Sequence, residues 1–89
     1  MSSLYVNDYR TFIAALVKVR KNLGIHQSEM AHALRIGQSM YSKIERCERR
    51  IDSVEAQRIC ELLGVSHAEI LDSLGLRFKP LRPGRAFTG

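Results

Sequence analysis

A chain of 89 residues with a hydrophobic content of 45% has the size and composition of one small globular domain, which excludes wholesale disorder. No apolar run approaches the roughly 20 residues of a membrane-spanning helix, and the N-terminus lacks the features of a signal peptide, so we expect a soluble cytoplasmic protein without a membrane partner. The net charge of +5 favours an acidic partner.

Apolar residues recur at helical spacing along most of the chain, and no useful stretch alternates as a β-strand does. The expected helices span about residues 8–22, 27–34, 38–46, 53–63 and 67–74. Asn7 or Asp8, then Asp52 and Ser66, have the side chains that cap helix starts. The expected core consists of Phe12, Ile13, Leu16, Val19, Leu23, Met30, Ala31, Leu34, Tyr41, Ile44, Ala56, Ile59, Cys60 and Leu63.

The helical pattern places one domain over residues 8–75, between a flexible N-terminus over 1–7 and a basic arm over 76–89 that contains Pro and Gly. The arm is expected to be extended. It reaches DNA, packs on the domain or a partner, or only aids solubility, and the sequence leaves these alternatives open.

Basic residues gather around the third expected helix and in the arm. The two groups are Arg35, Lys43, Arg46, Arg49 and Arg50, and Arg77, Lys79, Arg82 and Arg85. Only Glu45 and Glu48 accompany the first group, and no acid accompanies the second. Such asymmetry favours a surface that faces a polyanion, with an ordinary solvated surface as the alternative. Arg46, Arg49 and Arg50 are the expected phosphate contacts.

The third expected helix also carries a row of side chains that can hydrogen-bond DNA base edges: Gln38, Ser39, Ser42 and Lys43. Gln38 is the strongest candidate, because a glutamine pairs bidentately with N6 and N7 of adenine. The alternative is an exposed helix start without a ligand.

Three ordered motifs carry a family resemblance. They are Leu23-Gly24 with Gln27-Ser28-Glu29-Met30-Ala31, then Gln38-Ser39 with Ser42-Lys43-Ile44-Glu45, then Leu62-Leu63-Gly64-Val65-Ser66. At these spacings the chain resembles the phage-repressor and Cro-type helix-turn-helix family, also called XRE-like regulators, from about Asp8 to Leu74. The resemblance implies an all-α, five-helix, lambda-repressor-like DNA-binding domain whose third helix enters the major groove.

The resemblance also implies roles for single residues. The positions of Gln38, Ser39, Ser42 and Lys43 face bases or nearby phosphates. Gln27 opens the second helix and contacts a phosphate. Arg20 pairs with Glu45 as a partly buried clamp between the first and third helices, and Arg20 is also placed among the phosphate contacts.

Three departures from the family pattern concern the segments that flank the third helix. Arg35 stands where the family commonly has Gly, and a left-handed conformation there costs a non-glycine residue about 1 kcal/mol. Gly37 replaces a better helix cap, and Cys47 replaces the Gly that commonly follows the third helix. We therefore expect an altered or strained turn geometry.

The functional prediction is a sequence-specific, double-stranded DNA-binding transcription regulator, expected to be a repressor that binds a pseudo-palindromic operator as a homodimer. The expected dimer interface is Val65, Ile70, Leu71 and Leu74, which alternatively complete the monomer core. Two alternative functions are compatible with the same fold. One is an antitoxin-like or adaptor protein whose main partner is a protein, and the other is a controller of a restriction–modification system.

Nothing in the sequence indicates catalysis, a cofactor or a metal site. His26 and His32 lie about 9 Å apart along a helix axis, too far to ligate one ion. Cys47 and Cys60 form no CxxC pair, so Cys60 is expected in the core. A redox signal at Cys47 stays open.

Overall fold

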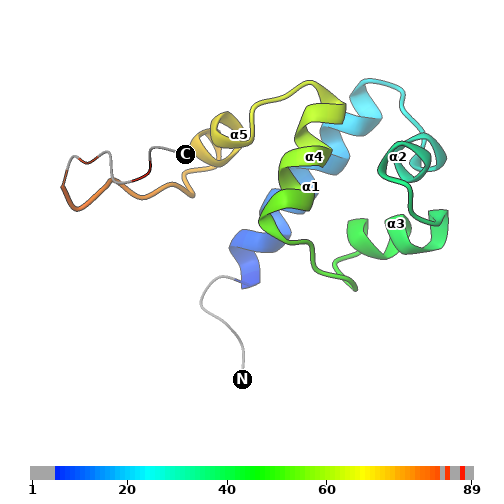
Figure 1. Ribbon diagram of the computed structural model, residues 1–89, viewed down its shortest axis with the longest axis horizontal. Coiled ribbons are helices and arrows are strands. Elements are labelled where there is room, and N and C mark those ends of the chain that lie inside the picture. The colour runs from blue at the N-terminus through cyan, green and yellow to red at the C-terminus, as the bar shows by residue number, and fades with distance from the viewer. Residues whose placement is uncertain (1–5, 83, 85–86, 88–89) are drawn as a thin grey trace.

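The computed structural model describes residues 6–82, 84 and 87. It contains five helices and, within those residues, no strand. The helices are α1 (Val6–Asn22), α2 (Gln27–Leu34), α3 (Gln38–Glu45), α4 (Ser53–Leu63) and α5 (His67–Ser73) (Figure 1). The predicted all-α, five-helix fold is confirmed. In the described part of the chain, no helix is both long and apolar enough to cross a membrane.

The helices pack around a central pair, α1 and α4, which contact each other (Figure 1). At one end α2 packs against α3, while α2 also contacts α4 and α3 also contacts α1. At the other end α5 contacts both α1 and α4. There the rings of Phe12 and His67 lie with their centroids 5.2 Å apart. This arrangement leaves α3 at an outer edge of the molecule, away from α5.

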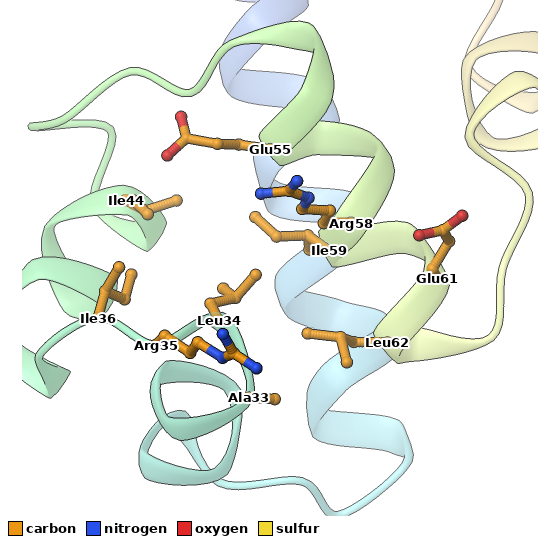
Figure 2. Close-up of a pocket in the computed structure, with 10 residues that line it drawn as sticks. All are labelled: Ala33, Leu34, Arg35, Ile36, Ile44, Glu55, Arg58, Ile59, Glu61 and Leu62. Carbon is orange, nitrogen blue, oxygen red and sulfur yellow. The ribbon is translucent and has the colours of Figure 1, made fainter.

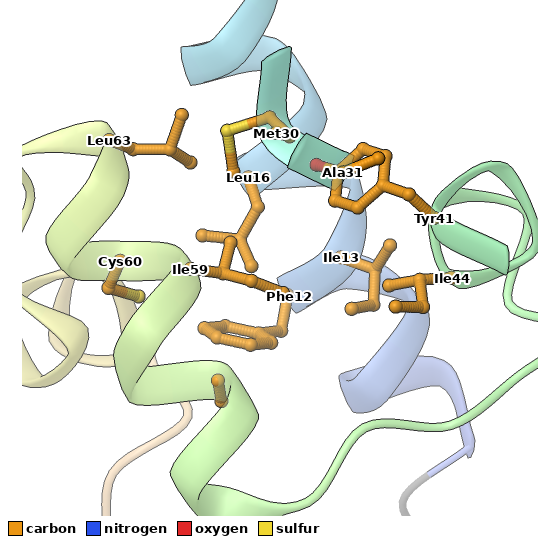
Figure 3. Packing of buried hydrophobic residues seen from close by; sticks show 11 residues of the cluster. Phe12, Ile13, Leu16, Met30, Ala31, Tyr41, Ile44, Ile59, Cys60 and Leu63 are labelled. Atoms are coloured by element: carbon orange, nitrogen blue, oxygen red, sulfur yellow. The ribbon is translucent and has the colours of Figure 1, made fainter. Parts of the chain in front are cut away.

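The buried core follows the predicted pattern closely (Figure 3). All but three of the predicted core residues are buried, and Val19 and Leu34 are half-buried against the cluster. The prediction that Leu23 lies in the core is wrong, because 54% of its surface is exposed. It lies just beyond the last residue of α1, where the chain turns away through Gly24 at φ +71°. The helical spacing that predicted its burial has already ended there.

α1 begins at Val6, so the expected cap at Asn7 or Asp8 is wrong and both residues lie in its first turn. There the Asp8 carboxylate complements the positive end of the helix dipole. The rest of the expected flexible N-terminus, residues 1–5, lies outside the described residues. The arm runs on from α5 without a helix or strand in its described residues.

The cap expected at Asp52 is present as a reciprocal pair of hydrogen bonds. The Asp52 carboxylate accepts from the Glu55 backbone N at 2.7 Å, and the Glu55 carboxylate accepts from the Asp52 backbone N at 3.1 Å. At α5 the Ser66 hydroxyl accepts from the Glu69 backbone N at 3.2 Å. These bonds satisfy donors that a helix start otherwise leaves unpaired, and they fix where α4 and α5 begin.

Both connections that flank α3 contain a non-glycine residue in the left-handed conformation. Arg35, which ends α2, and Cys47, which follows α3, each have φ +61°. In the described residues no other non-glycine residue has a positive φ. The backbone N–H groups of Arg35 and Ile36 close α2 by donating to the carbonyls of His32 and Ala31. The shape of the turns is therefore not altered, because both keep the left-handed conformation that glycine commonly provides, and the expected strain falls on Arg35 and Cys47.

Replacing Arg35 by glycine should raise the free energy of unfolding by about 1 kcal/mol, because glycine adopts this conformation without a clash at Cβ. The measurement is urea unfolding followed by circular dichroism. Arg35→Ala is the matched control: it also removes the charge but retains Cβ, so it should not reproduce the gain. Equal stabilisation by both variants would show that the charge, and not the backbone conformation, is responsible.

Candidate nucleic-acid interface

α3 has one buried and one exposed face. Tyr41 and Ile44 are 2% and 3% exposed and anchor the helix in the core. Gln38, Ser39 and Lys43 are exposed and Ser42 is half-buried on the other side. The predicted base-contacting residues therefore share the outer face of a short helix, and every one of them carries a hydrogen-bonding group.

A bidentate ion pair holds the C-terminal end of α3 to α1. The Arg20 Nε donates to Glu45 Oε2 at 2.6 Å, and Arg20 Nη2 donates to Glu45 Oε1 at 3.0 Å. Arg20 Nη1 donates to the backbone carbonyl of Ile25 at 2.7 Å. The two side chains are only 9% and 8% exposed. The charges are thus removed from water but paired and hydrogen-bonded, as a buried ion pair requires.

Gln27 extends this pair into a three-residue cluster. Its side-chain amide donates to Glu45 Oε1 at 2.7 Å. The start of α2, the end of α1 and the end of α3 therefore meet at a single carboxylate. We call Arg20, Gln27 and Glu45 the clamp. Because the clamp joins three helices, it fixes the position of α3 relative to the start of α2.

The environment of the clamp favours its charged form. Burial by itself would raise the pKa of Glu45, but hydrogen bonds from Arg20 and Gln27 and the charge of Arg20 outweigh it, so the pKa is lowered. The hydrogen bond that Arg20 donates to Glu45 likewise raises the pKa of Arg20. Burial, followed by the neighbouring Glu45, raises the pKa of Tyr41, which keeps its hydroxyl protonated beside the carboxylate.

Burial argues against one predicted role of Arg20. The residue is 7% exposed, and all three guanidinium nitrogens donate to Glu45 or Ile25. A phosphate contact would need a guanidinium that reaches the surface. We therefore assign Arg20 to the clamp alone. Gln27 is half-buried at the start of α2, where its second amide hydrogen still has no partner among the described residues.

Arg46 follows α3 directly and is paired at the surface. Its guanidinium binds both carboxylate oxygens of Glu48 at 2.9 and 3.3 Å, and its Nη1 donates to the Ser42 hydroxyl at 2.6 Å. The bond to Glu48 raises the pKa of Arg46 and lowers that of Glu48. The pair orients Arg46 along the exposed face of α3, next to Ser42.

Arg49 and Arg50 are held by partners from other elements. Arg49 is half-buried and binds the Glu55 carboxylate at 2.9 and 3.3 Å. The guanidinium carbon of Arg50 lies 4.2 Å from the ring centroid of Tyr9, a cation–π contact. The Ile51 backbone N donates to the Tyr9 hydroxyl at 3.1 Å. Sequence reasoning missed Tyr9, because no local pattern joins the start of α1 to the α3–α4 connection.

The residues predicted for dimerisation are only partly buried within the monomer. Val65, Ile70 and Leu71 are half-buried and pack against the core, and Leu74 is half-buried as well. Both readings of this surface stay compatible with such burial, because part of each side chain faces solvent.

In the arm, Leu76 packs against the core while Phe78 and Leu81 are 83% and 101% exposed. The described part of the arm therefore contacts the domain only at its root. Arg85, one of the basic arm residues, lies outside the described residues.

Cys60 is fully buried as expected, and burial raises the pKa of its thiol. Cys47 is a free, half-buried cysteine. Over residues 6–82 and at positions 84 and 87, no group of three or more His, Cys, Asp or Glu side chains is arranged to hold a metal ion.

A family model described as helix-turn-helix matches residues 16–70, which is more than half of the chain and includes all of α2, α3 and α4. No curated protein and no solved structure matches the chain significantly. The matched residues contain the clamp and the exposed face of α3. The chain therefore belongs to the XRE family of helix-turn-helix proteins, a family of DNA-binding transcription regulators and not of enzymes.

Proposed function

We propose that the protein is a repressor that binds a pseudo-palindromic operator as a homodimer, with α3 of each protomer in the major groove. The observation that carries this proposal is the combination of the clamp and the polar outer face of α3. A base-reading helix must be rigid, because small changes in its position break several hydrogen bonds at once. The clamp provides that rigidity from inside the domain.

Within this proposal the DNA-facing side chains on and around α3 make two kinds of contact. Base edges are contacted by Gln38, Ser39, Ser42 and Lys43. Phosphates are contacted by Gln27, Arg46, Arg49 and Arg50. Gln27 begins α2 and Arg46 directly follows α3, and the hydrogen bond from Gln27 to Glu45 brings these two positions to the same end of α3. Phosphate contacts beside the base-contacting side chains set the register at which those side chains enter the groove.

A dimer is proposed because a single domain of this size contacts only a short stretch of DNA. One recognition helix reads only a few base pairs, and two copies related by a two-fold axis place their helices about 34 Å apart, one helical turn of DNA. Val65, Ile70, Leu71 and Leu74 are the proposed interface. Val65 precedes α5, Ile70 and Leu71 lie on it, and Leu74 follows it, at the end of the molecule away from α3 (Figure 1). Association there leaves both copies of α3 free.

The test is a selection of binding sites from random duplexes at two salt concentrations, followed by sedimentation of the complex. Enrichment of an inverted repeat with half-sites about 10 base pairs apart, bound by two protomers, is the expected result. A reporter promoter that overlaps the selected site should be silenced. Enrichment of a single half-site bound by one protomer would contradict the dimer, and an absence of any enrichment would contradict sequence-specific binding.

A further inference from the structure

A groove with a volume of about 470 Å³ lies between the C-terminal end of α2, the turn into α3, and α4 (Figure 2). No residue proposed for base, phosphate or dimer contact lines it. The groove is therefore distinct from the surfaces proposed for DNA binding and dimerisation.

The floor of the groove is apolar. Leu34 and Ile36 are half-buried there, and Ile59 lies beneath them at 2% exposure. Leu62 on α4 forms one wall and is 42% exposed, which is high for a leucine that lines a concavity. Covering such a surface with another apolar group releases water and favours association.

The charged residues at the rim differ in the partners that they already have within the chain. Glu55 is paired with Arg49, whereas Glu61 keeps its negative charge and accepts a hydrogen bond from the neutral Gln57 amide at 3.3 Å. Figure 2 shows the Glu61 carboxylate pointing away from the apolar floor. By contrast Arg35 and Arg58 are exposed, and within the described residues neither forms an ion pair. The rim therefore offers two guanidinium groups that lack a carboxylate.

These features decide between possible occupants. The arm of a second copy carries Arg77, Lys79 and Arg82 without an acid, so the rim would repel it. A DNA backbone would leave the apolar floor unused. A segment with apolar side chains on one face and carboxylates beside them would pack on the apolar floor and form ion pairs with the arginines at the rim. Grooves between helices bind such amphipathic segments through apolar residues spaced three or four apart.

We propose that this groove docks an acidic amphipathic helix of a protein partner. The partner's apolar side chains rest on Leu34, Ile36 and Leu62, and its carboxylates pair with Arg35 and Arg58. The proposal does not require the DNA-binding residues, so the regulator can hold the partner and DNA together. It adds a protein-contact surface different from α5 and the arm.

The experiment is a selection of displayed 16-residue random peptides against the full chain, with counter-selection against Arg35→Glu/Arg58→Glu. Enriched peptides should carry Asp or Glu beside apolar residues at helical spacing. Synthetic copies, measured by fluorescence anisotropy, should lose about tenfold or more in affinity with the double variant and with Leu62→Gln. They should also bind more weakly as salt increases. Amide chemical shifts should move chiefly at residues that line the groove.

Matched controls are Arg10→Glu on α1 and Leu23→Gln, which change an exposed arginine and an exposed leucine outside the groove. Both should bind the peptides as the wild type does. Retained helical circular dichroism checks that each variant folds. The proposal is overturned if the enriched peptides are basic, if nothing is enriched over the double variant, or if the controls lose affinity equally. If benzoate displaced the peptides with an affinity equal to theirs, the proposal would be overturned in favour of a small-molecule site.

Discussion

Replacing Glu45 by glutamine should lower the free energy of unfolding by about 3 kcal/mol, because it leaves the buried guanidinium of Arg20 without a counter-charge. The loss is large for a domain of 89 residues, which has few interactions to spare. The melting temperature should fall by more than about 10 °C. Urea and thermal unfolding followed by circular dichroism measure both quantities.

Glu48→Gln is the matched control, because it removes the carboxylate of an exposed pair from the same segment. Exposed pairs contribute little, so this variant should remain close to the wild type. The double variant Arg20→Met/Glu45→Leu should recover much of the loss, since two apolar groups leave no buried charge. Similar stabilities for Glu45→Gln and Glu48→Gln would contradict the role assigned to the clamp.

The clamp also predicts a pH dependence. The pKa of Glu45 is lowered in the folded protein, so its contribution is fully present above the unfolded-state value near 4.5. It is lost as the pH falls through the lower folded-state pKa. The stability difference between wild type and Glu45→Gln should therefore be constant from pH 7 to 6 and shrink below about pH 4.5. A difference that persists unchanged at acidic pH would mean that the lost interaction is not ionic.

Replacing Gln38 by alanine should abolish base preference at one position of each half-site, at a cost of about 1–3 kcal/mol for the preferred sequence. Gln38 is the first residue of α3, is exposed, and forms no side-chain hydrogen bond among the described residues. Its removal therefore leaves the fold and the clamp intact. The measurement is affinity for the selected duplex and for duplexes substituted at each position.

Arg50→Ala is the control for this experiment. A phosphate contact contributes to all sequences alike, so the variant should weaken binding uniformly and reduce the salt slope by about one. Among the described residues Arg50 forms no ion pair. Arg46 is a poorer choice, because it binds Glu48 and also donates to the hydroxyl of Ser42, a proposed base contact. If Gln38→Ala weakened every duplex equally, or if Arg50→Ala changed the preferred sequence, the division into base and phosphate contacts would be wrong.

The helices and the core were predictable because each depends on local information. Helical spacing placed Tyr41 and Ile44 inside, and the Asp52 cap marked the start of α4. The pairing of Arg20 with Glu45, 25 residues apart, came only from the family resemblance. Nothing in the local pattern of charges distinguishes that buried pair from the exposed pair of Arg46 and Glu48.

What the sequence could not predict depends on the packing of distant segments. Gln27 was expected to face phosphate, yet its amide also completes the clamp, because the start of α2 meets the end of α3. The contacts of Tyr9 with Arg50 and Ile51 join residues about 40 positions apart. The groove beside α4 likewise forms only where three segments meet, so no single stretch of sequence could reveal it.

Arg46 and Arg49 each carry an internal counterion, in Glu48 and Glu55, before any DNA is present. Attraction to arbitrary DNA grows with the number of cations that are free to neutralise phosphates, so it is weaker here than the basic residues around α3 suggest. Most of a genome is non-specific competitor. A regulator that adheres weakly to that competitor has more unbound copies for its operator. For the operator binding proposed above, the two carboxylates are therefore expected to improve discrimination between sites at the expense of overall affinity.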